Sequence, residues 1–157
     1  MGDWEAQILI QFKTFFGNLS QILSESVRLM LPGFKKLVLV MCGGGLGAAS
    51  RYAAGMLAAR YWGTNFPWGT LAVNLSGCFL IGLLFSLADR VRLLTPDMRL
   101  FLITGYLGAL TTFSSFALET VNAGRAGMTL QPLLNILANN VGGLSLTIFG
   151  YWLGSLK

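Results

Sequence analysis

The chain is 157 residues long, and 54% of these residues are hydrophobic while only 11% are charged. Because the few charges lie mostly between long apolar runs, the composition excludes an ordinary soluble domain and predicts an integral membrane protein. The formal net charge of +5 would favour nucleic acid in a soluble protein, but here it indicates which loops face the cytoplasm, so no nucleic-acid partner is expected. The sequence contains no histidine and no nucleophile beside a base, so we do not expect an enzyme.

The first 33 residues follow a pattern of their own. Their apolar residues recur at three-to-four spacing and are Trp4, Ile8, Phe12, Phe15, Phe16, Leu19, Ile22, Leu23, Val27 and Met30. Polar residues fill the positions between them, which predicts an amphipathic helix lying in the membrane interface, with Pro32 and Gly33 expected to end it. A signal peptide is not expected, because Asp3, Glu5 and Lys13 interrupt the basic and apolar regions that it requires.

Four later segments are apolar over about 20 residues, the length needed to cross the hydrocarbon core. The predicted spans are Leu37–Ala59, Trp68–Leu87, Leu100–Ala123 and Leu130–Leu153. Short connections rich in turn residues join them, so an all-α bundle of four transmembrane helices is expected over residues 34–157, after the extension over residues 1–33. Four helices enclose little interior, so we also expect an oligomer. Cys42 and Cys78 lie in separate spans and show neither disulfide nor zinc-ligand spacing.

Positive charge is unevenly distributed between the two sides of this four-span arrangement. Arg60 and Arg125 fall on one side, and the other side holds Lys35, Lys36, Arg90, Arg92, Arg99 and Lys157. The excess of basic residues in cytoplasmic loops predicts that both termini face the cytoplasm.

The first span begins with a glycine-rich stretch, Val38–Arg51, that imitates the strand and glycine turn of a dinucleotide-binding fold. That fold also needs an acid about 20 residues further on, and the chain has no acidic residue between Glu25 and Asp89, which argues against it. In a membrane helix, Gly43 and Gly47 instead share one face and allow close helix packing.

Two ionisable residues are expected inside the membrane. Arg51 lies in the first span, where burial is costly unless the side chain faces the interior, and its positive charge would attract an anion. Glu119 is the only acid in the four spans. The two residues either form a charge-compensating pair or lie separately along a pathway, and the sequence leaves both alternatives open.

Polar residues interrupt the second and third spans. Asn74 carries an amide that must bond across a helix interface or to a ligand. Residues 104–119, TGYLGALTTFSSFALE, place glycines and hydroxyls inside an apolar helix, which is typical of an ion pathway. Phe113 and Phe116 lie one turn apart, a spacing that serves packing or turns the positive ring edges toward a small anion.

Three motifs occur in order on the first three spans: GGGLGAASRY at Gly43–Tyr52, GTLAVNLSG at Gly69–Gly77, and TGYLGALTTFSSFALE at Thr104–Glu119. Together they closely resemble the Fluc (CrcB-type) fluoride channels of microbial membranes. The resemblance covers about Lys36–Leu156 and leaves the leading amphipathic segment outside. It implies passive, fluoride-selective export across the plasma membrane, the inner membrane of a bacterium, which protects the cell from fluoride.

The resemblance also implies an assembly and a set of functional residues. By this resemblance, the protein is expected to form a dimer of two antiparallel subunits. Fluoride pathways and a structural sodium ion are expected at the subunit interface. A break in the third helix would free the carbonyls of Gly108 and Thr111 to hold sodium. Phe113, Phe116 and Asn74 would contact fluoride. The remaining pathway residues implied are Thr70, Ser114, Ser115, Glu119 and Arg51.

The fourth span departs from the family pattern. Polar positions there correspond to Asn139, Gly143 and Thr147, with Asn140 or Ser145 as alternatives. The loop charges favour one orientation, so the antiparallel partner is either a second copy or an oppositely inserted paralogue. A proton-coupled exporter of lipophilic cations would need an acid in the first span, where this chain has arginine. A membrane scaffold without transport is the other alternative.

Overall fold

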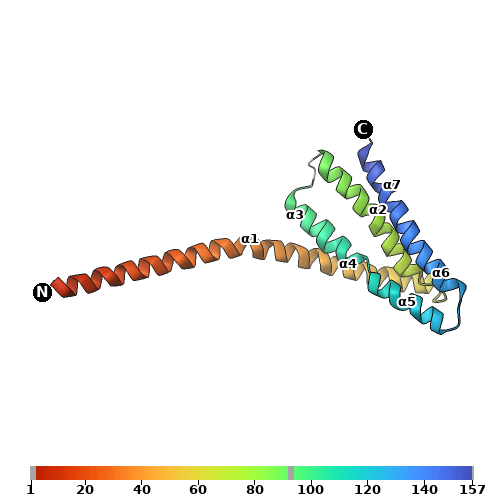
Figure 1. The fold of residues 1–157 in the computed structure, drawn as a ribbon, viewed down its shortest axis with the longest axis horizontal. Coiled ribbons are helices and arrows are strands. Elements are labelled where there is room, and N and C mark those ends of the chain that lie inside the picture. The colour runs from red at the N-terminus through yellow and green to blue at the C-terminus, as the bar shows by residue number, and fades with distance from the viewer. Residues whose placement is uncertain (1–2, 92–93, 157) are drawn as a thin grey trace. The chain divides into compact units, whose positions relative to one another are not determined.

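The computed structural model describes the backbone of residues 3–91 and 94–156. It also describes their side chains, except those of residues 3–12, 15, 23, 26–32 and 89–91. Every regular element in these described ranges is helical (Figure 1). In chain order the helices are α1 (Asp3–Trp62), α2 (Trp68–Val91), α3 (Pro96–Arg99), the π-helix η1 (Leu100–Leu107), α4 (Gly108–Leu110), α5 (Phe113–Arg125), α6 (Leu130–Leu137), the π-helix η2 (Ala138–Gly142) and α7 (Gly143–Ser155). The chain divides into two compact units, Met1–Val38 and Leu39–Lys157.

Four stretches of helix are long and apolar enough to cross a membrane. They are Gly33–Trp62, Trp68–Ala88, Pro96–Arg125 and Leu130–Ser155. The third combines α3, η1, α4 and α5, and the fourth combines α6, η2 and α7. These ranges confirm the predicted all-α fold with four spans.

The prediction that Pro32 and Gly33 end the first helix is wrong, because α1 continues through both residues to Trp62. Proline removes one backbone hydrogen bond and crowds the preceding turn, but a helix can continue beyond it with a kink. The first span ends instead just before Gly63, where φ is +76°, and the third span ends just before Gly127, where φ is +79°. Only a residue without Cβ adopts that left-handed conformation readily.

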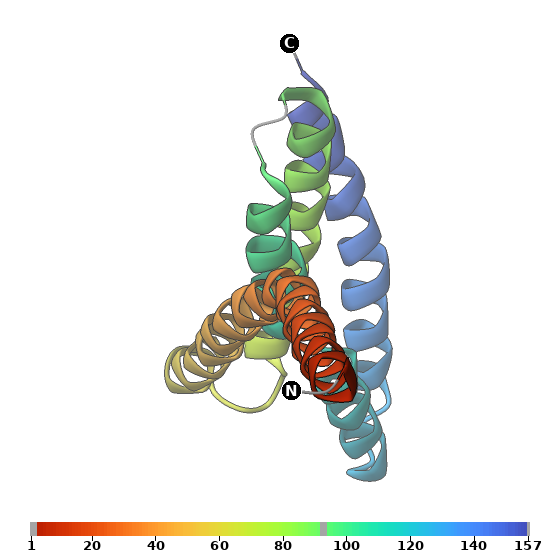
Figure 2. The same ribbon diagram turned by 90° about the vertical axis from the view of Figure 1, so that its left-hand side faces the viewer.

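The second and fourth spans pack backbone against backbone. α2 and α7 lie side by side (Figure 2), and glycines line the contact from both sides. A Cβ at Gly150 would collide with the carbonyl of Phe79, and one at Gly82 would collide with the carbonyl of Thr147. Small residues therefore allow these two helices to approach as closely as their backbones permit.

The first and third spans approach each other in the same way. A Cβ at Gly43 would collide with the carbonyl of Phe101, and one at Gly47 with the carbonyl of Tyr106. These contacts confirm the predicted packing role of the two glycines. Val73, Leu107 and Leu110 form the small buried cluster beside this contact. Many other large apolar side chains are exposed, as expected for surfaces that face lipid or another subunit.

Candidate functional site

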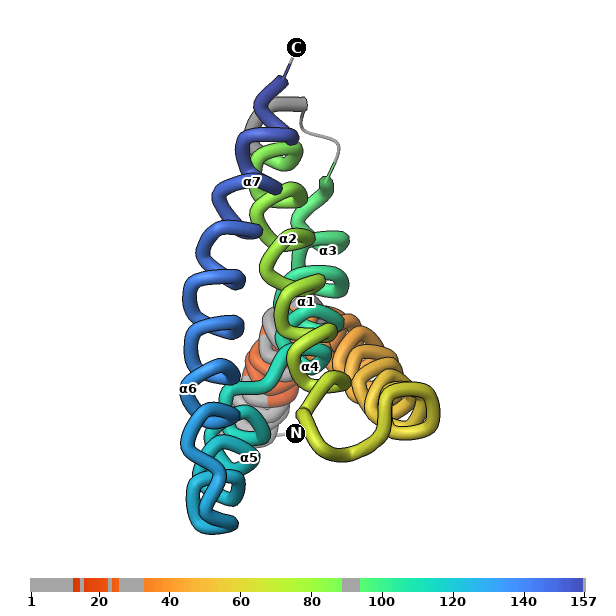
Figure 3. The backbone as a smooth tube through the Cα atoms, turned by 90° about the vertical axis from the view of Figure 1, so that its right-hand side faces the viewer, coloured from red at the N-terminus to blue at the C-terminus, as the bar shows by residue number. Residues whose placement is uncertain are grey.

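The third span is broken in its middle. The last helical residue of α4 is Leu110, and Thr111 (φ −80°, ψ 154°) and Thr112 (φ −152°, ψ 119°) are extended. The helix resumes at Phe113, where the hydroxyl of Thr112 caps α5 by accepting from the Ser115 backbone N–H at 3.2 Å. Figure 3 shows this short non-helical link between α4 and α5. The predicted break is confirmed.

Asn74 on α2 completes the break. Its Oδ1 accepts from the Thr112 backbone N–H at 2.8 Å, and its Nδ2 donates to the Thr112 carbonyl at 3.1 Å. The amide thus replaces both hydrogen bonds that an uninterrupted helix would give to Thr112. The Thr112 N–H would otherwise bond to the carbonyl of Gly108, which therefore loses its helical donor. Of the two roles left open for Asn74, the structure shows the bond across the helix interface.

A ladder of amides continues from Asn74 into the fourth span. Asn74 Nδ2 also donates to Asn139 Oδ1 at 2.9 Å, and Asn139 Nδ2 donates to Asn135 Oδ1 at 2.9 Å. Asn135 Nδ2 then donates to the Thr120 hydroxyl on α5 at 2.8 Å. The Asn135 side chain is only 1% exposed. This amide ladder, Asn74–Asn139–Asn135–Thr120, joins the second, third and fourth spans around the break.

A groove of about 320 Å³ opens at the break. The rings of Phe113 and Phe116 stand 5.4 Å apart, tilted by 59°. Phe116 is 6% exposed and Phe113 is 76% exposed. Residues lining the groove include Asn74, Gly108, Thr111, Thr112, Phe113, Phe116 and Asn139.

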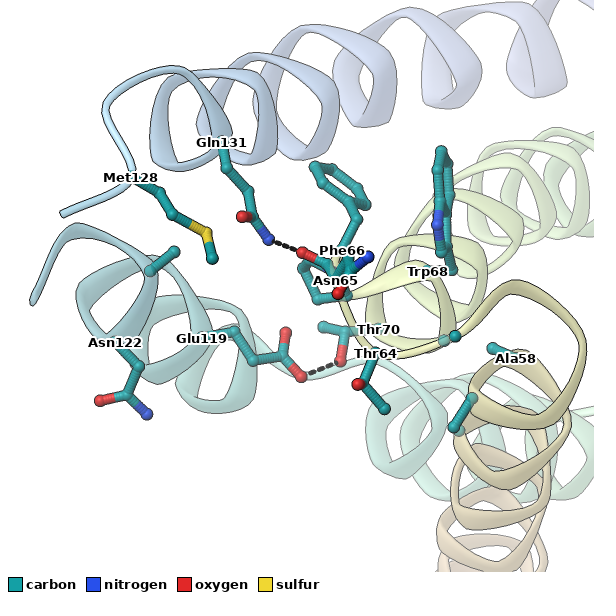
Figure 4. Close-up of a pocket in the computed structure, with 16 residues that line it drawn as sticks. Ala58, Thr64, Asn65, Phe66, Trp68, Thr70, Glu119, Asn122, Met128 and Gln131 are labelled. Atoms are coloured by element: carbon teal, nitrogen blue, oxygen red, sulfur yellow. Dashed lines mark hydrogen bonds between the residues drawn. The ribbon is translucent and has the colours of Figure 1, made fainter. Parts of the chain in front are cut away.

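A second pocket of about 420 Å³ lies at the N-terminal end of α2, beside the first loop, which joins α1 to α2. There the Thr70 hydroxyl donates to Glu119 Oε1 at 2.7 Å (Figure 4). Glu119 Oε2 is buried, and no hydrogen-bond partner in the described part of the chain reaches it. Gln131 donates to the Asn65 carbonyl beside this carboxylate and fastens the first loop to α6 (Figure 4). Among the described residues Glu119 is therefore bonded to Thr70 and not to Arg51.

The predicted functional residues fall into three groups. Asn74, Phe113, Phe116, Gly108 and Thr111 meet at the groove, whereas Thr70 and Glu119 meet in the second pocket. Ser114 and Ser115 lie within hydrogen-bond distance of the Thr112 hydroxyl, each at 3.2 Å. Arg51 and Thr147 line neither pocket, and the Thr147 hydroxyl donates to the Gly143 carbonyl of its own helix.

Sequence reasoning missed Asn135 and Thr120. The available signal was the four-residue spacing of Asn135 and Asn139, which places both amides on one face of a helix. Asn139 and Asn140 are the amides predicted for this span, and both line the groove. Asn140 instead bonds to the Ile136 carbonyl of its own helix and is exposed.

The chemistry of the junction suits an anion better than a transition metal. Amide N–H groups, hydroxyls and ring edges converge there, and all of these present positive ends of dipoles. Within the described residues, no group of three or more His, Cys, Asp or Glu side chains is placed to hold a metal ion. The break also exposes backbone carbonyls, which are ligands for hard cations such as sodium.

The four spans define a multi-pass membrane protein. Its third transmembrane helix is interrupted by a polar, non-helical link. Comparison with known families matches residues 38–151 to the family described as CrcB-like protein, Camphor Resistance (CrcB). The chain belongs to this CrcB family.

Relatives of this chain include three proteins named "Fluoride-specific ion channel FluC". The protein from Agrobacterium fabrum is 46% identical over 118 residues, which cover 75% of this chain and 94% of the relative. The protein from Chlorobium phaeobacteroides is 42% identical over 123 residues, 78% of this chain and 95% of the relative. The protein from Legionella pneumophila is 48% identical over 112 residues, 71% of this chain and 83% of the relative.

Proposed function

We propose that this protein is a fluoride-selective ion channel that exports fluoride passively and protects the cell from fluoride toxicity. The family membership and the names of the relatives support this function. A channel is not an enzyme, and the arginine in place of an acid in the first span disfavours a cation exporter. The plasma membrane, the inner membrane of a bacterium, is the proposed location.

The observation that carries the proposal is the junction of the Asn74 amide with the Phe113 and Phe116 rings at the broken helix. Fluoride is small and strongly hydrated, so its passage requires several donors that replace water in a narrow space. Asn74 has one N–H on the Thr112 carbonyl and one on Asn139. A fluoride ion in the groove would take the place of the Asn139 oxygen as the acceptor, while the ring edges offer further positive dipoles.

The remaining polar residues would extend this pathway. The hydroxyls of Ser114 and Ser115 gather at Thr112, and Thr70 and Glu119 lie in the second pocket. Arg51, in the first span, would attract anions toward the entrance by its charge. Thr147 remains a predicted pathway residue on the fourth span.

A second subunit is part of the proposal. The groove is open and Phe113 is largely exposed in the single chain, so an antiparallel partner would enclose the pathway and shield it from lipid. The partner is either a second copy or an oppositely inserted paralogue. The Gly108 carbonyl, which has lost its helical donor, and the Thr111 carbonyl would hold a structural sodium ion. Bound sodium would supply positive charge that fastens the interface and favours anions.

The test is fluoride efflux from liposomes that contain the purified chain, with Phe113→Ile compared with Phe149→Ile. Both positions are exposed phenylalanines in spans. Phe149, however, lies in the middle of α7, where it contacts Phe79 and Trp152, and it lines neither pocket. We expect Phe113→Ile to abolish selective fluoride efflux and Phe149→Ile to preserve it. Equal efflux from both variants would refute the proposed aromatic site. No efflux from the unmodified chain, alone or with a paralogue, would refute the function.

A further inference from the structure

The segment before residue 38 lies outside the family match. It is helical over Asp3–Val38 as the first part of α1, drawn red to orange in Figure 1, and it belongs to a unit separate from Leu39–Lys157. The family match thus covers nearly all of the four spans without this segment. The role of the segment has to be inferred from its own residues.

One side of this helix is apolar. At 100° per residue, Phe16, Leu19 and Ile22 fall on one face, and their side chains are 53%, 39% and 60% exposed. Gln21 falls on the opposite side and Lys13 at the flank of the face, and both are also exposed. These three side chains, Phe16, Leu19 and Ile22, therefore give the helix an apolar face at its own surface. The sequence alone continues the same face to Trp4 and Met30 at its two ends, which makes it broader than the narrow seam of a two-stranded coiled coil.

The helix continues directly into the first span. In the part of the chain whose side chains are described, this span covers Gly33–Trp62, and its 30 residues at 1.5 Å per residue already exceed a hydrocarbon core of about 30 Å. One crossing therefore has no room for residues 3–32 as well. Pro32 has no backbone N–H, and a bend at that point would cost the helix little further hydrogen bonding.

We propose that residues 3–33 form a surface-lying helix whose apolar face is buried in the lipid bilayer at its boundary with water. Continuity with the first span keeps the segment at the bilayer, and its face offers aromatic and branched side chains that favour this boundary. Its charges are Asp3, Glu5 and Glu25 against Lys13 and Arg28, so attraction to anionic headgroups is weak. The binding partner is therefore the apolar part of the lipid, and neutral phosphatidylcholine is sufficient. This inference needs only the spans and does not depend on fluoride transport.

The test places a fluorescent label on each face of the full-length chain. Cys42 and Cys78 are replaced by alanine, and a single cysteine is introduced as Leu19→Cys on the apolar face or Gln21→Cys on the opposite face. Each protein is labelled with an environment-sensitive dye and reconstituted in phosphatidylcholine liposomes. Quenching is measured with spin-labelled lipids and with aqueous iodide, at low and at high salt.

We expect the label at position 19 to be quenched several-fold more by spin-labelled lipid than the label at position 21, with the reverse order for iodide and no effect of salt. Equal iodide quenching at both positions would overturn the proposal in favour of a helix that projects into water. Protection of position 19 from both quenchers would overturn it in favour of a protein partner. The pair Ile22→Cys and Ser24→Cys asks the same question if the first pair does not fold.

Discussion

The contact between α2 and α7 and the junction at the broken third span are held together by opposite means. Along α2 and α7, glycines bring backbones into contact, and added side-chain atoms at Gly150 or Gly82 have no space. At the junction, by contrast, the helix is interrupted and side-chain amides satisfy the backbone of Thr112. The first region depends on the absence of side chains, and the second depends on particular side chains.

Within one small bundle, the glycine contact fixes the positions of the helices and the interrupted helix supplies the polar groups. Backbone packing through glycine presents few donors to a passing ion and fixes the positions of the helices. The interrupted helix presents donors, but it stays folded only because Asn74 and the amide ladder replace the missing hydrogen bonds. Substitutions in the first region should therefore change stability, whereas substitutions in the second should also change transport.

The largest loss of stability is expected for Gly150→Ala, because its Cβ would meet the carbonyl of Phe79 and force α2 and α7 apart. We expect a loss of about 2–3 kcal/mol in the free energy of unfolding, as for an overpacked core. The measurement is equilibrium unfolding in mixed micelles. Gly45→Ala is the matched control, since nothing lies within 4 Å of a Cβ there, and it should leave stability unchanged or slightly higher. Equal destabilisation by both changes would refute the close contact.

Asn74→Ala should affect both properties. It leaves the Thr112 N–H and carbonyl without their partners, which is expected to cost about 2 kcal/mol of stability. Because the proposed donor is lost as well, fluoride efflux from liposomes should fall at least about tenfold, even in the fraction that remains folded. Ser76→Ala is the control, since among the described residues the Ser76 hydroxyl bonds only to the Val73 carbonyl of its own helix, and Ser76 lines neither pocket. Full transport by folded Asn74→Ala would show that this amide is structural alone.

Asn135→Leu tests the amide ladder at its most buried member. The change removes the bonds to Asn139 and Thr120, and we expect a loss of about 1 kcal/mol, since such bonds in membranes are worth about 0.6 kcal/mol on average. A double-mutant cycle with Asn139→Ala, measured by unfolding in micelles, should show non-additive losses. Strict additivity would mean that the two amides act independently.

The smallest effect is expected for Thr70→Val, which removes the single hydrogen bond to Glu119. We expect stability to change by less than about 1 kcal/mol and fluoride efflux to fall modestly, because the carboxylate is no longer held in one orientation. Glu119→Gln, combined with Thr70→Val in a cycle of efflux rates, would show coupling between them. Rates that multiply independently would place these two side chains on separate steps.

Hydropathy and composition were sufficient to predict the four spans, because a span needs only length and apolar character. The break in the third span was predictable through the resemblance to a known family, since the glycines and hydroxyls of residues 104–119 by themselves indicate polar groups in the helix and not where it stops. The close approach at Gly43 and Gly47 followed from their four-residue spacing.

Other features depended on three-dimensional register that the sequence does not encode locally. The amide ladder needs Asn135 and Asn139 to face Asn74 across a helix interface. Their four-residue spacing places both amides on one face of the fourth span, but it does not indicate which neighbouring helix that face meets. The separation of Arg51 from Glu119 likewise depends on how two spans cross. Continuation of α1 through Pro32 could not be predicted from the local sequence, because proline inside a helical pattern either ends the helix or only kinks it.

The most direct test of the central claim is the ratio of fluoride to chloride efflux from liposomes that contain the unmodified chain, measured in parallel with Asn74→Ala and Ser76→Ala. We expect fast fluoride efflux with negligible chloride efflux for the unmodified chain and for Ser76→Ala, and its loss in Asn74→Ala. Comparable fluoride and chloride efflux, or selective efflux that survives in folded Asn74→Ala, would contradict a fluoride pathway built on the broken third helix.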